Sequence, residues 1–398
     1  MLEPREVLTE GSRLTFKIIV VARVVRAFGF GLLSVALALY LGDRGLSPFA
    51  VGAMLTLALL AGAAFLMAAA PLVRHVGRRR ALLLSSAAMC VAGLFLGIPG
   101  SIFPIVLACL LGTLSAGGQD VGPFAAIEQP AVAESRPAQS TAHSFAVYNL
   151  AGAFALALGA LAAAAIPTRW IPWTYAGCGL LLAAVYATLP QSDSATPRAE
   201  VAAPRTRFGP AERLAMLFSL DALAGGFVVQ SFVAYWFHLR FGVDQRQLGI
   251  VLFGANTLSA LSYPVAAWLS SRIGLLRTMV FTHLPSNVML CIVPLMPTFD
   301  GAVSVLLARF ALSQMDVPTR QAFTMDAVSP EDRAHAAALT NAVRPAAAAI
   351  APVFAGLAMQ SAAIGAPFFV AGGLKIVYDL AVFHAFKRPK SPSASSNP

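Results

Sequence analysis

Apolar runs of about 20 residues recur along this chain, separated by short stretches that contain Gly, Pro and charged residues. A helix rises about 1.5 Å per residue, so roughly 20 apolar residues cross the hydrocarbon core of a bilayer. Only 12% of the residues are charged, whereas soluble domains carry about 25%. The chain therefore cannot cover itself with an ordinary water-facing surface, and we predict an all-α membrane protein that lies in a lipid bilayer.

The apolar runs predict twelve transmembrane helices. They are expected, within several residues, at 16–41, 49–72, 80–98, 102–122, 142–166, 172–190, 211–238, 246–270, 277–297, 300–323, 334–359 and 363–386. The segment 191–210 contains Ser, Asp, Pro and Arg without a long apolar run, which is typical of a linker. It separates an N-terminal six-helix half, 1–190, from a C-terminal six-helix half, 211–386. Residues 387–398 are expected to form a disordered cytoplasmic tail.

Lys and Arg gather on one side of this arrangement. Most of the 28 fall in the termini and the even-numbered loops, whereas the odd-numbered loops hold only Arg44, Arg169, Arg240 and Arg246. Positive residues accumulate in cytoplasmic loops, so both termini are expected in the cytoplasm. The same short segments explain the net charge of +10. Since no nucleic-acid-binding motif accompanies them, no nucleic-acid partner is expected.

The two halves repeat one pattern. An offset of 197 residues pairs Gly29 with Gly226, Phe30 with Phe227, Gly52 with Gly249, Gly77 with Gly274 and Arg80 with Arg277. Glycines mark turns and close helix contacts that larger residues cannot make. A second echo relates residues 119–123, QDVGP, to residues 314–318, QMDVP. These matches predict two pseudo-symmetric six-helix bundles.

Residues 70–80 read APLVRHVGRRR. Through Gly77, Arg78 and Arg79 they resemble the loop signature of the major facilitator superfamily, Gly-x-x-x-Asp-Arg-x-Gly-Arg-Arg/Lys. Ala70 replaces the leading Gly, and Arg74 replaces the Asp that helps to gate the cytoplasmic side in that family. The resemblance covers nearly the whole chain. It implies a fold of twelve helices in two bundles that works by alternating access around a central cavity.

Within the family, residues 316–321, DVPTRQ, are similar to those of poorly characterised bacterial members, and the chain has a general likeness to antiporter-like bacterial members. Two marks of drug/proton antiporters are missing: an Arg within 102–122 and a Gly-Pro pair near the end of 142–166. The resemblance implies a secondary active transporter of a small solute in a bacterial inner membrane. Proton-coupled efflux is the expected activity. The alternatives are uptake of a small anionic metabolite and a non-transporting receptor or scaffold.

Charged residues within the spans are the first candidates for a site, because a charge at membrane depth usually faces a cavity or a partner. Arg26 is expected either to face the cavity or to reach the lipid headgroups. Arg344 is expected to be a cavity cation or a partner of Asp316. Asp221 is expected to carry a proton, or to cap a helix or form a pair near the cytoplasmic surface. Asp316 and Arg320, four residues apart, are expected to couple to protons or to form a structural pair.

Further polar residues complete the prediction. The residues expected to line the cavity are Arg26, Tyr148, Asn149, Asn256, Tyr263, Asn341 and Arg344. Asp120 and Glu128 are expected to form a cytoplasmic gate with Asp221, Asp316 and Arg320. Lys375 and Asp379, four residues apart, are expected to pair with each other.

Other chemistry is not expected. The sequence contains no Gly-rich phosphate loop with Lys and Ser or Thr, no metal-binding His spacing and no nucleophile elbow. We therefore expect no cofactor, no metal and no enzymatic activity. The expected partners are a small-molecule substrate, protons and the bilayer, and a monomer suffices for this architecture.

Overall fold

The computed structural model describes residues 10–118, 122–134, 141–190, 209–329, 332–361 and 363–387, and all regular structure within these ranges is helical. The first half contains α1 (Glu10–Asp43), α2 (Pro48–Val76), α3 (Arg78–Gly97), α4 (Phe103–Leu110), α5 (Phe124–Glu134), α6 (Thr141–Ala165) and α7 (Ile171–Ala187). The second half contains α8 (Pro210–Phe227), α9 (Gln230–Phe241), α10 (Gln245–Ile273), α11 (Leu275–Ile292), α12 (Phe299–Ser313), α13 (Asp316–Asp326), α14 (Arg333–Gln360) and α15 (Ala366–Phe386).

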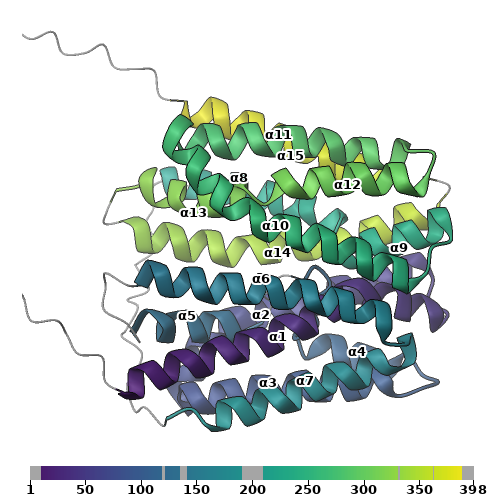
Figure 1. Cartoon of the computed structure of the whole chain (residues 1–398), viewed down its shortest axis with the longest axis vertical. Helices are drawn as coiled ribbons and strands as arrows, with labels where there is room; N and C mark the ends of the chain where they lie inside the picture. Colours follow the sequence, from purple (N-terminus) through teal and green to yellow (C-terminus); the bar gives the residue numbers. More distant parts are fainter. Residues whose placement is uncertain are drawn as a thin grey trace, which may run out of the picture.

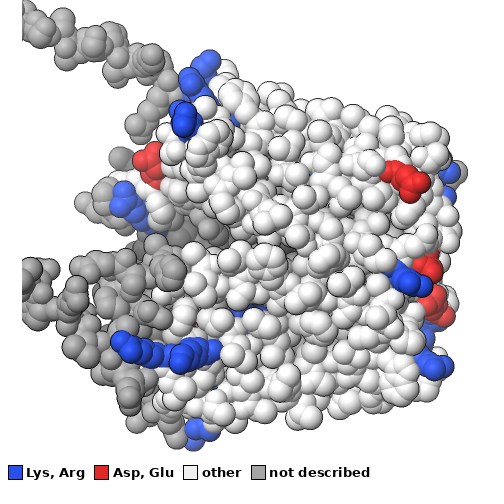
Figure 2. Space-filling view, in the orientation of Figure 1, with Lys and Arg blue, Asp and Glu red and all other residues white. Residues whose placement is uncertain are grey.

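In Figure 1 the first half lies below and the second half above. α1 begins and α15 ends on the same side of the bundle, which we call the terminal side; the opposite side is the far side. Figure 2 shows charged residues gathered toward these two ends of the molecule, with a broad uncharged band between them. Such a band matches the hydrocarbon core of a membrane. The predicted linker lies almost wholly in 191–208, outside the described residues, as does the predicted tail beyond Lys387.

Ten helices in the described ranges are long and apolar enough to cross a membrane, with α8 and α9 together forming one of them. The prediction of continuous helices at 102–122 and 300–323 is wrong. Within the first span, α4 ends at Leu110, and α5 begins at Phe124, beyond the predicted end; the second span is divided into α12 and α13. In each pair one helix lies toward the far side and the other toward the terminal side (Figure 1). Gly112, Gly118 and Gly122 have positive φ in the first interruption, so a helix cannot continue there.

Glycine also ends two helices at corresponding positions of the repeat. Gly77 closes α2 at φ 82°, and Gly274 closes α10 at φ 89°. This backbone conformation is open to glycine and strained for other residues. Each glycine directly precedes the next helix, so both loops are one residue long. Gly77 and Gly274, which the sequence repeat pairs, therefore form equivalent turns in the structure.

Close contacts between the two halves gather at the far side. The Gln245 side-chain nitrogen donates to the backbone oxygens of Ala163 at 2.5 Å and Ile166 at 2.8 Å. α2 and α14 approach so closely that a Cβ on Gly52 would lie 2.4 Å from the backbone oxygen of Pro352. The surface in Figure 2 is hollowed between the halves toward the terminal side. The structure therefore represents a state in which the far side is closed.

α9 is buried between the two halves on the far side, where it packs against α1 (Figure 1). Every residue of α9 from Gln230 to Phe237 is buried, and the backbone N–H of Ser231 donates to the backbone oxygen of Ala116 at 2.9 Å. Ala116 lies in the interruption between α4 and α5, so the break in the first half contacts the start of α9 in the second.

Candidate functional site

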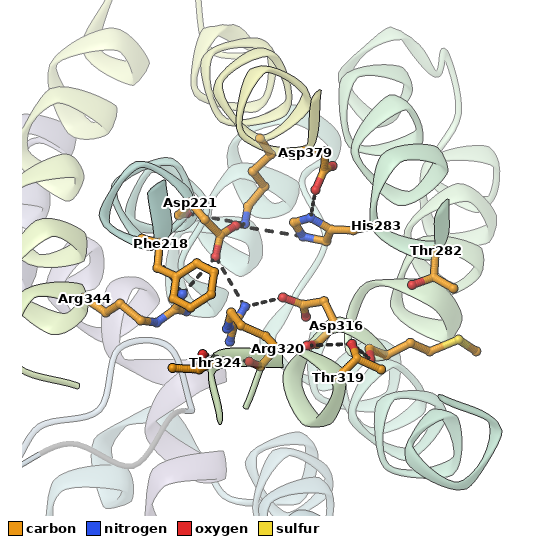
Figure 3. Close-up of polar contacts among 12 residues, drawn as sticks. Phe218, Asp221, Thr282, His283, Asp316, Thr319, Arg320, Thr324, Arg344 and Asp379 are labelled. Carbon is orange, nitrogen blue, oxygen red and sulfur yellow. Dashed lines mark hydrogen bonds and ion pairs between the residues drawn. The ribbon is translucent and has the colours of Figure 1, made fainter. Parts of the chain in front are cut away.

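Asp221 on α8 lies at the centre of a cluster of charged side chains in the second half (Figure 3). The Nζ of Lys375 donates to its Oδ1 at 2.5 Å. Arg344 and Arg320 approach its Oδ2 at 3.3 Å and 3.5 Å. The Nε2 of His283 lies 3.9 Å from Oδ1. Because Asp221 is only 4% exposed, these groups rather than water must balance its charge.

Two more carboxylates extend the cluster. Asp316, the first residue of α13, accepts a hydrogen bond from Arg320 one turn later. Asp379 on α15 lies 2.8 Å from the Nδ1 of His283 and accepts from the side-chain nitrogen of Asn287 at 2.8 Å. His283 and Asn287 are four residues apart on α11, which places both on one face. We call the following set the second-half cluster: Asp221, His283, Asp316, Arg320, Arg344, Lys375 and Asp379.

Exposure is uneven within the second-half cluster. Arg344 is 24% exposed and Arg320 is 12% exposed, whereas the Asp379 side chain is fully buried. The arginines therefore form its accessible edge, and the carboxylate paired with His283 forms its interior. Arg309 on α12 is also buried, within electrostatic reach of both Asp221 and Asp316.

The first half contains a separate buried network. Arg26 on α1 and Glu128 on α5 form an ion pair at 2.7 Å, and both side chains are 0% exposed. Arg26 also donates to the hydroxyls of Tyr148 at 3.1 Å and Tyr186 at 3.2 Å. Tyr148 donates in turn to Glu128 at 2.6 Å, and Tyr186 donates to its other oxygen. Arg26 is thus bound within the protein and reaches neither an open cavity nor the headgroups in this state.

Tyr263 lies where the two halves meet. This half-buried residue of α10 experiences the charges of Asp316 and Arg320 from its own half and of Arg23 from α1. The Arg23 guanidinium lies 5.0 Å from the centre of the Tyr148 ring, beside the network of the first half. Tyr263 is therefore within electrostatic reach of charged residues from both halves.

The remaining predicted cavity residues are spread more widely. Asn256 on α10 is buried and accepts from the side-chain nitrogen of Gln230 at 3.1 Å. Asn149 on α6 and Asn341 on α14 are exposed in the terminal-side parts of their helices. Asp120 lies outside the described residues.

The loop that carries the family signature forms local contacts on the terminal side. Arg78 binds Glu134 at the end of α5 at 2.8 Å. Arg79 donates to the backbone oxygen of Ala187 at 2.5 Å. Arg74, which replaces the signature Asp, is exposed. The signature arginines therefore connect α3 to α5 and α7 within the first half.

Two pairings differ from the expectations. Lys375 binds Asp221 on α8 instead of Asp379, and Asp379 binds His283 on α11. Arg344 binds Asp221 instead of Asp316. Asp221 is buried and pairs with Lys375 and Arg344. By contrast, Asp316 and Arg320 pair as their four-residue spacing predicts.

His283 is not among the residues predicted from the sequence. It lies in an apolar run and belongs to no metal-binding pattern. The signal available was a polar face on one span, since His283, Ser286 and Asn287 lie three and four residues apart. All three are buried, which places that face against the protein interior.

Comparison with known proteins supports the family expected from the sequence. The family model described as Major Facilitator Superfamily matches residues 19–315 and 214–398. An uncharacterised membrane protein of Saccharomyces cerevisiae is 21% identical, over 89% of this chain and 90% of its own length. These matches do not support the expected bacterial source or the antiporter-like branch.

Solved structures share the fold at low sequence identity. The nucleoside transporter NupG has a TM-score of 0.74 at 14% identity, over 94% of this chain and 100% of NupG. A D-xylose-proton symporter has a TM-score of 0.72 at 12% identity, over 92% and 97% of the two chains. The human organic anion transporter MFSD10 has a TM-score of 0.67 at 16% identity, over 93% and 99%. From the family match, the helical spans and the fold, we conclude that this chain belongs to the Major Facilitator Superfamily and is a multi-pass secondary transporter of a small molecule, not an enzyme.

Proposed function

We propose that the second-half cluster couples the movement of a solute to the movement of protons. The observation that carries this proposal is that Arg320 is shared between two buried carboxylates, Asp316 and Asp221. A buried carboxylate stays ionised while a cation lies beside it and takes up a proton when that cation leaves. Any change that draws Arg320 away from Asp316 therefore favours protonation of Asp316.

Alternating access supplies such a change. In the state described here, the far side is closed by contacts such as that of Gln245 with α6. We place the terminal side in the cytoplasm, since Lys and Arg gather there. The described state is then open toward the cytoplasm. Rocking of the two halves would close that side, change the exposure of Arg320 and Arg344, and carry bound solute and proton across.

The direction of transport stays a prediction. Export was expected from the general likeness to antiporter-like members, and the same coupling serves import. We would test both with a growth panel in a pump-deficient bacterial host, using antibiotics, dyes, metalloids and toxic metabolite analogues. Cells would carry the wild type, Asp316→Asn, or Asp300→Asn as a matched control. Asp300 is an exposed residue on the far side, at the start of α12.

Resistance that Asp316→Asn loses and Asp300→Asn keeps would support proton-coupled export and identify a substrate class. Hypersensitivity to an analogue, lost in the same variant, would support proton-coupled import. Some compounds will change the growth of cells that carry the wild type. If Asp316→Asn changes growth on all of these compounds to the same extent, with equal protein in the membrane, a coupling role for Asp316 is refuted.

A further inference from the structure

We infer that the transported solute is a small organic anion whose charged group binds between Arg344 and Arg320. This inference rests on the proposed proton coupling and names the substrate class of the same site. The two arginines come from different helices, α14 and α13, and both approach Oδ2 of Asp221. Their guanidinium groups also lie over one aromatic ring, at 5.9 Å and 5.8 Å from the centre of Phe218. Two guanidinium groups therefore converge on one position from two sides.

Accessibility distinguishes the arginines from the carboxylate that they bind. Arg344 is 24% exposed and Arg320 is 12% exposed, whereas Asp221 is 4% exposed. A solute that enters from the terminal side therefore meets guanidinium groups before it meets Asp221. Guanidinium groups bind carboxylates, phosphates and sulfonates through charge-assisted, often paired, hydrogen bonds. The edge of the cluster that a solute reaches is thus suited to an anion.

The charge balance points the same way. The charged and titratable groups around the site are Asp221 on α8, Tyr263 on α10, His283 on α11, Arg309 on α12, Asp316 and Arg320 on α13, Arg344 on α14, and Lys375, Tyr378 and Asp379 on α15. The four basic residues among them, Arg309, Arg320, Arg344 and Lys375, outnumber the three acidic residues, Asp221, Asp316 and Asp379. Basic groups thus predominate where the two guanidinium groups converge, which suits this position to an anionic group.

An anion at this position also explains the coupling. If its charged group takes Arg320, Asp316 loses the hydrogen bond that it accepts from that residue. Asp316 then binds a proton more readily. The anion and the proton would occupy the site together and cross in the same direction. This mechanism favours the import of an anion with a proton, which is the alternative left open by the sequence.

The test is ligand binding to the purified full-length protein at equilibrium, measured as a rise in Tm without any ion gradient. The probes are benzoate, succinate, glycerol phosphate and benzenesulfonate, each paired with its neutral counterpart: benzamide, succinamide, glycerol and benzenesulfonamide. We expect at least one anion to stabilise the protein and its neutral counterpart not to do so. Arg344→Gln should weaken that binding about 10- to 100-fold, as expected for loss of one charged hydrogen-bonding group.

Arg240→Gln is the matched control, because Arg240 is exposed on the far side at the end of α9. It should bind the anion as the wild type does. Arg344→Lys keeps the positive charge and should bind the anion with intermediate affinity. Such partial recovery would show that the loss of binding in Arg344→Gln reflects the lost charge and not misfolding. The inference is overturned if no anion stabilises the wild type, if neutral counterparts stabilise it equally, or if Arg344→Gln binds the anion unchanged.

A further variant separates this inference from the proposed coupling. Asp316 competes with the anion for Arg320. Because Asp316→Asn removes this competing carboxylate, the variant should bind the anion at least as tightly as the wild type. It should also lose the part of the pH dependence of binding that Asp316 supplies. Anion binding that depends on Arg344 but keeps its full pH dependence in Asp316→Asn would uphold the anion site and refute the coupling role of Asp316.

Discussion

A single methyl group at Gly52 should shift the balance between the two states of this transporter. Gly52 on α2 packs directly against the backbone of α14. A Cβ there would lie 2.4 Å from the backbone oxygen of Pro352 and 3.1 Å from the Cα of Gly356. The contact is reciprocal, since a Cβ on Gly356 would lie 2.4 Å from the backbone oxygen of Pro48. These residues join the two halves at the far side.

The size of the effect follows from this geometry. Ordinary contacts of a Cβ begin near 3.4 Å, so α2 and α14 would have to separate by about 1 Å to accept Gly52→Ala. Overpacking of this kind costs about 1–3 kcal/mol. The close approach belongs to the state in which the far side is closed, so the penalty falls on that state. The ratio of the two states should therefore change about 5- to 150-fold in favour of opening at the far side.

Spin-label distances would measure this shift. One pair of labels at Ser101 and Asp300 reports on the far side, and a second pair at Arg80 and Arg277 reports on the terminal side, all at exposed positions in opposite halves. Gly52→Ala should lengthen the first distance and shorten the second. The labels require replacement of the native cysteines by Ala, which concerns Cys90, Cys109, Cys178 and Cys291.

Gly177→Ala provides the matched control. Gly177 lies within α7, and a Cβ there would meet no atom within 4 Å. This variant should keep both distance distributions of the wild type. If Gly52→Ala also leaves both distributions unchanged while the protein remains folded, closure of the far side does not depend on the contact between α2 and α14, and our reasoning is refuted.

Glu128→Gln leaves Arg26 buried without its negative partner, so it should lower stability by about 3–5 kcal/mol in detergent unfolding. Glu134→Gln, at a position that is 40% exposed, should cost at most about 1 kcal/mol, and equal losses in the two variants would contradict the assigned burial. Gly226→Ala would place a Cβ 2.2 Å from the backbone oxygen of Ala348 within the second half. It should cost about 1–3 kcal/mol of stability without changing the spin-label distances, and a shift of those distances would show that this contact is not internal to one half.

Hydropathy predicted the spans well where the helix is continuous. It did not predict that α4 ends at Leu110 or that α12 and α13 are separated at 314–315, because a hydropathy average does not detect where the backbone turns. A local signal was present for the first break, since Gly112, Gly118 and Gly122 follow α4 and have positive φ. The second break, at Gln314 and Met315, contains neither Gly nor Pro, and Pro318 lies within α13.

The sequence located most of the charged residues of the second-half cluster but not their partners. Spacing along one helix correctly paired Asp316 with Arg320, because both lie on one helix face. The same rule failed for Lys375 and Asp379, because contacts with α8 and α11 satisfy each of them instead. Such contacts depend on how helices distant in sequence pack together. Local periodicity carries no information about that packing.

Accumulation of an identified solute in proteoliposomes would show whether Asp316 couples transport to protons. With a pH gradient across the vesicle membrane, the wild type should concentrate the solute above its equilibrium level. Asp316→Asn should only equilibrate it, whereas Asp300→Asn should accumulate it as the wild type does. Accumulation by Asp316→Asn equal to that of the wild type would contradict our account of the second-half cluster.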